Sequence, residues 1–209
     1  LANYLVVKFG IIKENIDQFS FHFVTFTQNF KTPFYGFFWE SWSLSIEEWF
    51  YIFSPILILG LLRLVKPKRS FLIATMAMIV LPLLYRFDIH NPGIDHFWWD
   101  VTFRKTVLCR LDSIGYGLLG AWTIFYHPHL WRKIRIYSGL AGLAFILAIF
   151  NYESPVCSLY RQTVYFSLVP LSVLLCLPIF ESLKSGKGII PYGLQHISKI
   201  SYSMYLINL

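Results

Sequence analysis

Residues 162–180 read QTVYFSLVPLSVLLCLPIF, a run that contains no Asp, Glu, Lys or Arg. A helix needs about 20 predominantly apolar residues to cross the hydrocarbon core of a bilayer. The apolar residues of this run are continuous, whereas the wall of a transmembrane barrel requires apolar and polar residues to alternate. The run therefore predicts a membrane-spanning helix.

Further charge-free stretches occupy residues 49–62, 70–85, 113–131 and 136–152. With their flanks, these runs predict full spans at about 45–63, 70–86, 107–126, 136–152 and 163–181. The chain is 56% hydrophobic and 14% charged, whereas an ordinary soluble domain is about 25% charged. This composition argues against a soluble globule, because the chain has too few polar residues to cover its surface. It also excludes a disordered chain, because disorder requires low hydrophobicity. We expect an all-α, polytopic transmembrane helix bundle that forms a single domain over residues 1–209.

Both ends of the sequence lie within apolar runs. The chain opens on LANYLVVKFGII and stops about ten residues into a second run, ISYSMYLINL, which is too short to cross a bilayer. We therefore expect the first and last spans to be cut, so that the domain is truncated at both ends.

Basic residues alternate between the loops that connect the spans. The links after the first, third and fifth full spans hold nine Lys and Arg residues, whereas the intervening links at 86–106 and 151–162 hold four. The positive-inside rule places the richer set in the cytoplasm and the poorer set, with residues 13–44, outside. The net charge of +7 then reflects topology, and it requires no nucleic-acid partner.

Two acidic residues begin one of the predicted spans, in the segment WSLSIEEWFY (42–51). Ionisable groups at membrane depth are costly and often functional, which favours a role for Glu47. The alternative is capping, in which Ser43 or Ser45 begins the helix and both Glu47 and Glu48 lie in its first turn.

A second charged cluster lies in RLDSIGYG (110–117). By the predicted orientation, Arg110 and Asp112 enter their span from the same side as Glu47, so we expect the carboxylate of Glu47 and the guanidinium of Arg110 to meet at the outer rim. The alternative is an arginine that extends toward lipid headgroups.

Two further patterns, one of histidines and one of small residues, predict no reactive site. His90 and His96 share a loop with aspartates, but their spacing matches no tight metal-ligand pattern, and we predict no metal site. Four-residue spacing of small residues, at Gly117–Ala121 and Ser138–Gly142 with Gly120 and Gly139 nearby, predicts close helix packing.

The segment WSLSIEEWFY resembles the signature of the membrane acyltransferase 3 family, bacterial proteins that acylate cell-surface glycans. RLDSIGYGLLGAW (110–122) and ISKISYSMYL (197–206) are similar to two further motifs of that family, in the same order, and the resemblance covers about residues 28–209. It implies a multi-pass protein of the bacterial cytoplasmic membrane, with acyl-CoA, commonly acetyl-CoA, as donor substrate, no tightly bound cofactor, and a saccharide hydroxyl as acceptor.

The resemblance also implies site residues. Glu47 and Arg110 would lie in or beside the reaction site, and its substrate-binding surroundings would include Trp42, Ser43, Glu48, Asp112, Ser201 and Tyr202. The family's candidate base is a His on a first span, which would precede Leu1, so this stretch alone is expected to be inactive. Two other hypotheses stay open: a transporter or flippase for a lipid-linked or anionic substrate, and a non-catalytic membrane scaffold.

Overall fold

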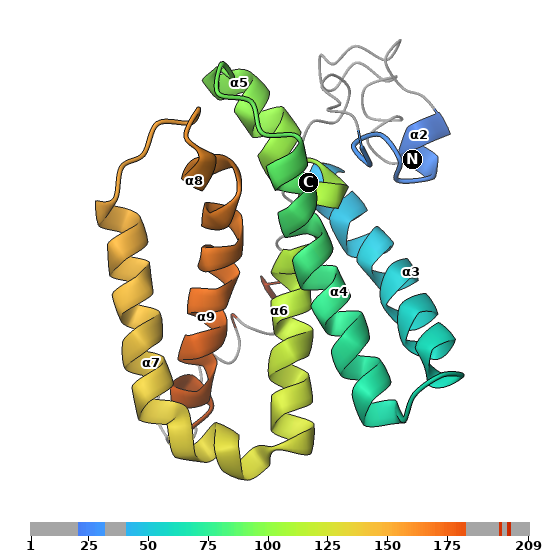
Figure 1. The fold of residues 1–209 in the computed structure, drawn as a ribbon, viewed down its shortest axis with the longest axis vertical. Coiled ribbons are helices and arrows are strands. Elements are labelled where there is room, and N and C mark those ends of the chain that lie inside the picture. The colour runs from blue at the N-terminus through green and yellow to red at the C-terminus, as the bar shows by residue number, and fades with distance from the viewer. Residues whose placement is uncertain (1–20, 32–40, 183–196, 198–199, 202–209) are drawn as a thin grey trace.

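The computed structural model describes residues 21–31, 41–182, 197, 200 and 201, and the elements in these ranges are all helical. The long helices run alongside one another (Figure 1): α3 (Trp42–Leu62), α4 (Pro67–Asp88), α6 (Val107–Tyr126), α7 (Pro128–Asn151) and α9 (Val164–Ser182). Shorter elements are α2 (Phe21–Val24), α5 (His96–Trp99), a π-helical turn η3 (Asp100–Arg104) and α8 (Leu159–Gln162). The predicted all-α bundle is confirmed.

Each predicted span forms a long helix, and the main differences lie at the basic ends. α4 begins at Pro67 rather than 70, and α7 begins at Pro128 rather than 136. Proline is favoured in the first turn of a helix, where its missing N–H has no partner to lose. The predicted spans begin later because the first two turns of both helices include Lys and Arg, whose long side chains can reach the headgroup region.

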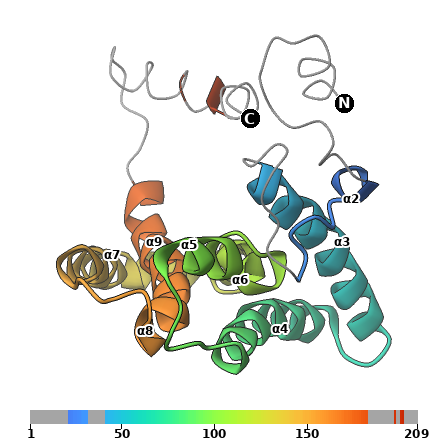
Figure 2. The same cartoon turned by 90° about the horizontal axis from the view of Figure 1, so that it is seen from above.

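Four of these helices, α3, α4, α7 and α9, are long and apolar enough to cross a membrane. The remaining predicted span, 107–126, forms α6 at its predicted bounds, with Arg110 and Asp112 in its first two turns. Viewed from above, α6 lies in the middle of the bundle, and it contacts α3, α4, α7 and α9 (Figure 2). Its charged residues are thus surrounded by protein.

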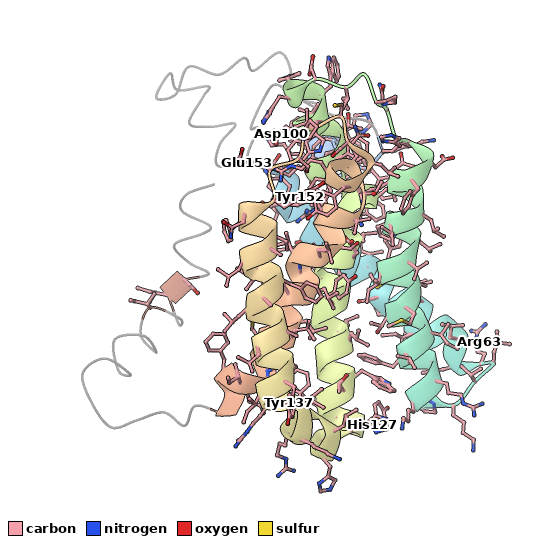
Figure 3. The ribbon with its side chains drawn as sticks, turned by 60° about the vertical axis from the view of Figure 1, so that its left-hand side comes forward. Arg63, Asp100, His127, Tyr137, Tyr152 and Glu153 are labelled. Carbon is pink, nitrogen blue, oxygen red and sulfur yellow. The ribbon has the colours of Figure 1, made fainter. Side chains whose placement is uncertain are left out.

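The loops gather at two opposite ends of the bundle. Asp100, Tyr152 and Glu153 lie at one end, whereas Arg63 and His127 lie at the other (Figure 3). The first group belongs to links that we predict to face outward, and the second to links that we predict to be cytoplasmic. The grouping of the loops is as predicted, and we call the end with Asp100 and Glu153 the outer end.

Small residues allow α7 and α9 to pack closely. A Cβ added at Gly142 would lie 2.6 Å from Cys176 Sγ and 2.7 Å from the carbonyl oxygen of Ser172. A Cβ at Gly120 of α6 would lie 2.7 Å from Leu174 Cδ1 of α9. Close packing is confirmed at these glycines, but not at Gly117, which has no neighbour within 4 Å of the corresponding position.

Gly142→Ala is expected to lower the stability of the protein by about 1–3 kcal/mol, because the added methyl group overlaps backbone as well as side-chain atoms of α9. Thermal unfolding in detergent measures the change. Gly117→Ala is the matched control on α6, and it should leave the unfolding midpoint unchanged or slightly higher. Equal midpoints for both variants would contradict this account of helix packing.

Candidate active site

The N-terminal ends of α3 and α6 are joined by Asn29, which is buried. Its Nδ2 donates hydrogen bonds to the carbonyl oxygens of Trp42, at 3.1 Å, and Lys105, at 2.5 Å. The backbone carbonyl oxygen of Asn29 accepts the N–H of Val107, at 2.9 Å, and the backbone carbonyl of Phe30 accepts that of Leu108, at 3.3 Å. The first N–H groups of a helix lack partners within it, and here the preceding segment supplies them. Both helices therefore start at the same end of the bundle.

Glu47 and Glu48 lie one turn deeper than the capping alternative requires. α3 begins at Trp42, with Ser41 before it, and its first turn holds no acidic residue. Ser45 is buried and does not cap the helix, because its Oγ accepts a hydrogen bond from Gln28 Nε2, at 2.6 Å, and donates to the Ser41 carbonyl, at 3.3 Å. The capping alternative is therefore wrong, and both glutamates lie half-buried on the helix surface.

Glu47 and Arg110 share the outer end of the bundle, as predicted. Glu47 is five residues into α3 and Arg110 three residues into α6, which corresponds to depths of about 7 Å and about 5 Å along each helix. Within the described ranges, no ion pair joins them. The predicted meeting of the two groups is thus correct in location and wrong as a direct contact.

Asp112 pairs with a different arginine. Arg86, in the last turn of α4, donates from Nη2 to Asp112 Oδ2, at 2.8 Å, and to Ser167 Oγ of α9, at 2.6 Å. Ser167 in turn donates to the same carboxylate oxygen, at 2.8 Å. Arg86 also donates to the carbonyl of Cys109. Arg86 and Asp112 are both fully buried, so this cluster links α4, α6 and α9 without reaching a cavity.

Our sequence reasoning treated Arg86 as the boundary of a span and missed it as a buried partner. A signal was available in the periodicity of α4. Its buried residues follow helical spacing, and Arg86 continues that stripe one turn after Pro82. An arginine that extends a buried stripe requires an acidic partner on a neighbouring helix.

Arg110 stands beside a cavity, and its guanidinium has spare hydrogen-bonding capacity. The guanidinium carbon lies 4.9 Å from the centre of the Phe166 ring, and Nε is buried without a hydrogen-bond partner. The cavity measures about 320 Å³ between α6 and α9, and Ser113 and Tyr116 also line it. A planar cation held in this way can bind a carboxylate, a phosphate or a developing oxyanion.

The remaining predicted residues are distributed around this end or lie elsewhere. Trp42 is half-buried, and the Arg104 guanidinium lies 5.7 Å above its ring. Ser43 is half-buried beside it in sequence. Ser201 is exposed, and Tyr202 lies outside the described residues. His90, considered above as a metal ligand, instead shares a hydrogen bond with Gln162 Oε1, at 2.7 Å.

The comparison with protein-family models supports the family resemblance of the sequence motifs. The family model for the acyltransferase domain of acyltransferase 3 proteins matches residues 1–209. A search of curated proteins and a search of solved structures each found no match. The match spans the whole sequence, and the apolar helices supply the membrane-spanning bundle. The chain belongs to the acyltransferase 3 family of membrane acyltransferases.

Proposed function

We propose that this protein transfers an acyl group, acetyl in the simplest case, from cytoplasmic acyl-CoA to a hydroxyl group of a cell-surface or lipid-linked saccharide. One observation carries the proposal: Arg110, in a family motif, lies near the outer end and has a partly unsatisfied guanidinium beside a cavity that extends toward the middle of the bundle. By the positive-inside rule that end faces away from the cytoplasm, and the proposed setting is the bacterial cytoplasmic membrane.

The chemistry requires three contributions. A base takes the proton of the acceptor hydroxyl, its oxygen bonds to the thioester carbonyl carbon, and the carbon–sulfur bond breaks as CoA leaves as a thiol. The tetrahedral intermediate carries an oxyanion, and we assign its stabilisation to Arg110. Glu47 has no ion-pair partner among the described residues, which leaves its carboxylate available to act as the base or to orient one.

A reconstitution experiment tests the proposal. The intact protein is placed in sealed vesicles with radiolabelled acetyl-CoA on the side of Arg63 and His127, and a saccharide acceptor on the side of Asp100 and Glu153. The expected result is radiolabelled saccharide and free CoA in equal amounts. Movement of the saccharide without release of CoA would instead support the transporter alternative, and neither process would support a scaffold.

A further inference from the structure

A second and larger cleft opens at the outer end, beside the Arg110 cavity. It measures about 920 Å³ and lies between the last turns of α7, the segment 152–156 and the first turns of α9. Tyr152 and Glu153 belong to its wall and lie at the outer end in Figure 3. Arg161, Tyr165 and His96 also line it. Unlike the apolar cavity lined by Phe53, Met78 and Leu111, this cleft combines aromatic rings with charged groups.

Arg161 is the cation of this cleft, and it is positioned by aromatic rings rather than by an acid. Its guanidinium carbon lies 4.1 Å from the centre of the Tyr165 ring and 5.2 Å from that of Trp99. Its Nε is buried without a hydrogen-bond partner, and no ion pair is formed by Arg161 within the described ranges. Stacking fixes the plane of a guanidinium and leaves its N–H groups available to an anion.

Three other basic residues of the outer end have acidic partners, whereas Arg110, described above, has none within the described ranges. Arg104 and Lys105 each form an ion pair with Asp100, at 3.1 Å. Arg86 is paired with Asp112 deeper in the bundle. Arg161 therefore differs from those three in lacking a negative partner, although it is partly buried and held in one place.

The wall that carries Arg161 is rigidly built. The next residue, Gln162, is fully buried and donates from Nε2 to the carbonyls of Asn91, at 2.8 Å, and Val156, at 3.0 Å. Its Oε1 accepts the N–H of Asn91, at 2.9 Å. Trp99 Nε1 donates to the Arg161 carbonyl, at 3.3 Å. A preformed site of this kind binds its ligand with little loss of side-chain freedom.

The remaining groups of the cleft suit a sugar. Ser154 Oγ is buried without a hydrogen-bond partner, and the exposed carboxylate of Glu153 can accept hydrogen bonds from hydroxyl groups. The rings of Tyr152, 58% exposed, and Phe150, 80% exposed, offer apolar surface. Val169 and Val173 of α9 line both this cleft and the Arg110 cavity, so the two openings adjoin at that helix.

We propose that this cleft binds an acidic saccharide, whose carboxylate or phosphate group sits on the Arg161 guanidinium while its hydroxyl groups face Glu153 and Ser154. The assignment deepens the proposed function, on which it rests for the identity of the ligand as acceptor. It makes the acceptor anionic and places its docking site beside the outer end of α9, next to the site of acyl transfer.

Binding of defined sugars tests this proposal without any acyl donor. The intact protein in nanodiscs of phosphatidylcholine is titrated with trigalacturonate and with the neutral maltotriose, and heat release is recorded. Trigalacturonate is expected to bind and maltotriose to bind at least about 10-fold more weakly, because a hydrogen bond to a charged group contributes more than a neutral one. Arg161→Gln should weaken trigalacturonate binding by about 10–100-fold.

Matched variants make the result specific to the cleft. Arg161→Lys keeps the charge but loses the planar guanidinium, and should bind with intermediate affinity. Arg132→Gln removes the same charge from an exposed position of α7 at the opposite end, and should bind as the wild type does. Thermal unfolding of each variant verifies that a loss of binding is not a loss of fold.

The outcomes separate this proposal from the proposed function. Binding that depends on Arg161 but leads to no acyl transfer upholds the cleft and counts against the acyltransferase assignment. Equal binding of the two sugars, or unchanged binding by Arg161→Gln, overturns the cleft proposal whether or not transfer occurs. Loss of trigalacturonate binding in discs that contain phosphatidylglycerol, at about 0.15 M salt to screen the charge of the disc surface, would identify a lipid headgroup as the occupant, and would also overturn it.

Discussion

Asp112→Ala is expected to destabilise the bundle by about 3–5 kcal/mol, since it leaves the buried guanidinium of Arg86 without its negative partner. Arg86 cannot move to water from its position between α4, α6 and α9, where its exposure is 0%. It also cannot release its proton under ordinary conditions. The measurement is the denaturant midpoint of the purified protein in detergent, followed by loss of helical circular dichroism.

Two companion variants define how much of this loss belongs to the ion pair. Ser167→Ala removes one neutral donor to the carboxylate and should cost about 0.5–1.5 kcal/mol. Replacing both partners, as in Arg86→Met with Asp112→Leu, should recover much of the loss, because neither buried charge remains. If Asp112→Ala were as stable as the wild type, the cluster would not hold the three helices together.

Much of the fold was predictable from the sequence, because lipid imposes a simple requirement on it. Backbone polar groups in the bilayer core must be satisfied within the segment, so a long charge-free run has to be helical. This requirement alone predicts a helix for the charge-free run at 162–180, and the structure has α9 there, Val164–Ser182. The less accurate ends, at Pro67 and Pro128, lie where basic side chains continue a helix beyond the apolar region.

The site was only partly predictable, because its pairings depend on how helices are rotated. Topology brought Glu47 and Arg110 to one end, but it does not say which face of each helix meets the other. Asp112 lies two residues after Arg110, about 200° around the helix, and so faces α4 and Arg86. Asn29 joins the starts of α3 and α6 through tertiary hydrogen bonds, which no periodic pattern in the sequence predicts.

Arg110→Ala is expected to lower the rate of acyl transfer by about 100–1000-fold, the usual cost of removing one oxyanion-stabilising donor. Stability should change little, since the Arg110 guanidinium has no ion-pair partner within the described ranges and its Nε has no hydrogen-bond partner. The measurement is the initial rate of radiolabelled acetyl transfer in vesicles, with unfolding midpoints determined on the same preparations. Glu47→Gln should show the same pattern of lost activity and retained fold.

A variant of Arg86 is the control for this prediction, because the two arginines have different surroundings. Both arginines lie within the bundle, but Arg86 is bonded to Asp112 and Ser167, whereas the Arg110 guanidinium stacks on Phe166 and faces a cavity. Loss of the first should therefore appear as unfolding and loss of the second as inactivity. Arg110→Lys should retain part of the rate, because the charge remains while the planar geometry is lost. If Arg110→Ala kept the full rate in a folded protein, the oxyanion would have to be stabilised elsewhere, and the cavity between α6 and α9 would lose its assigned role.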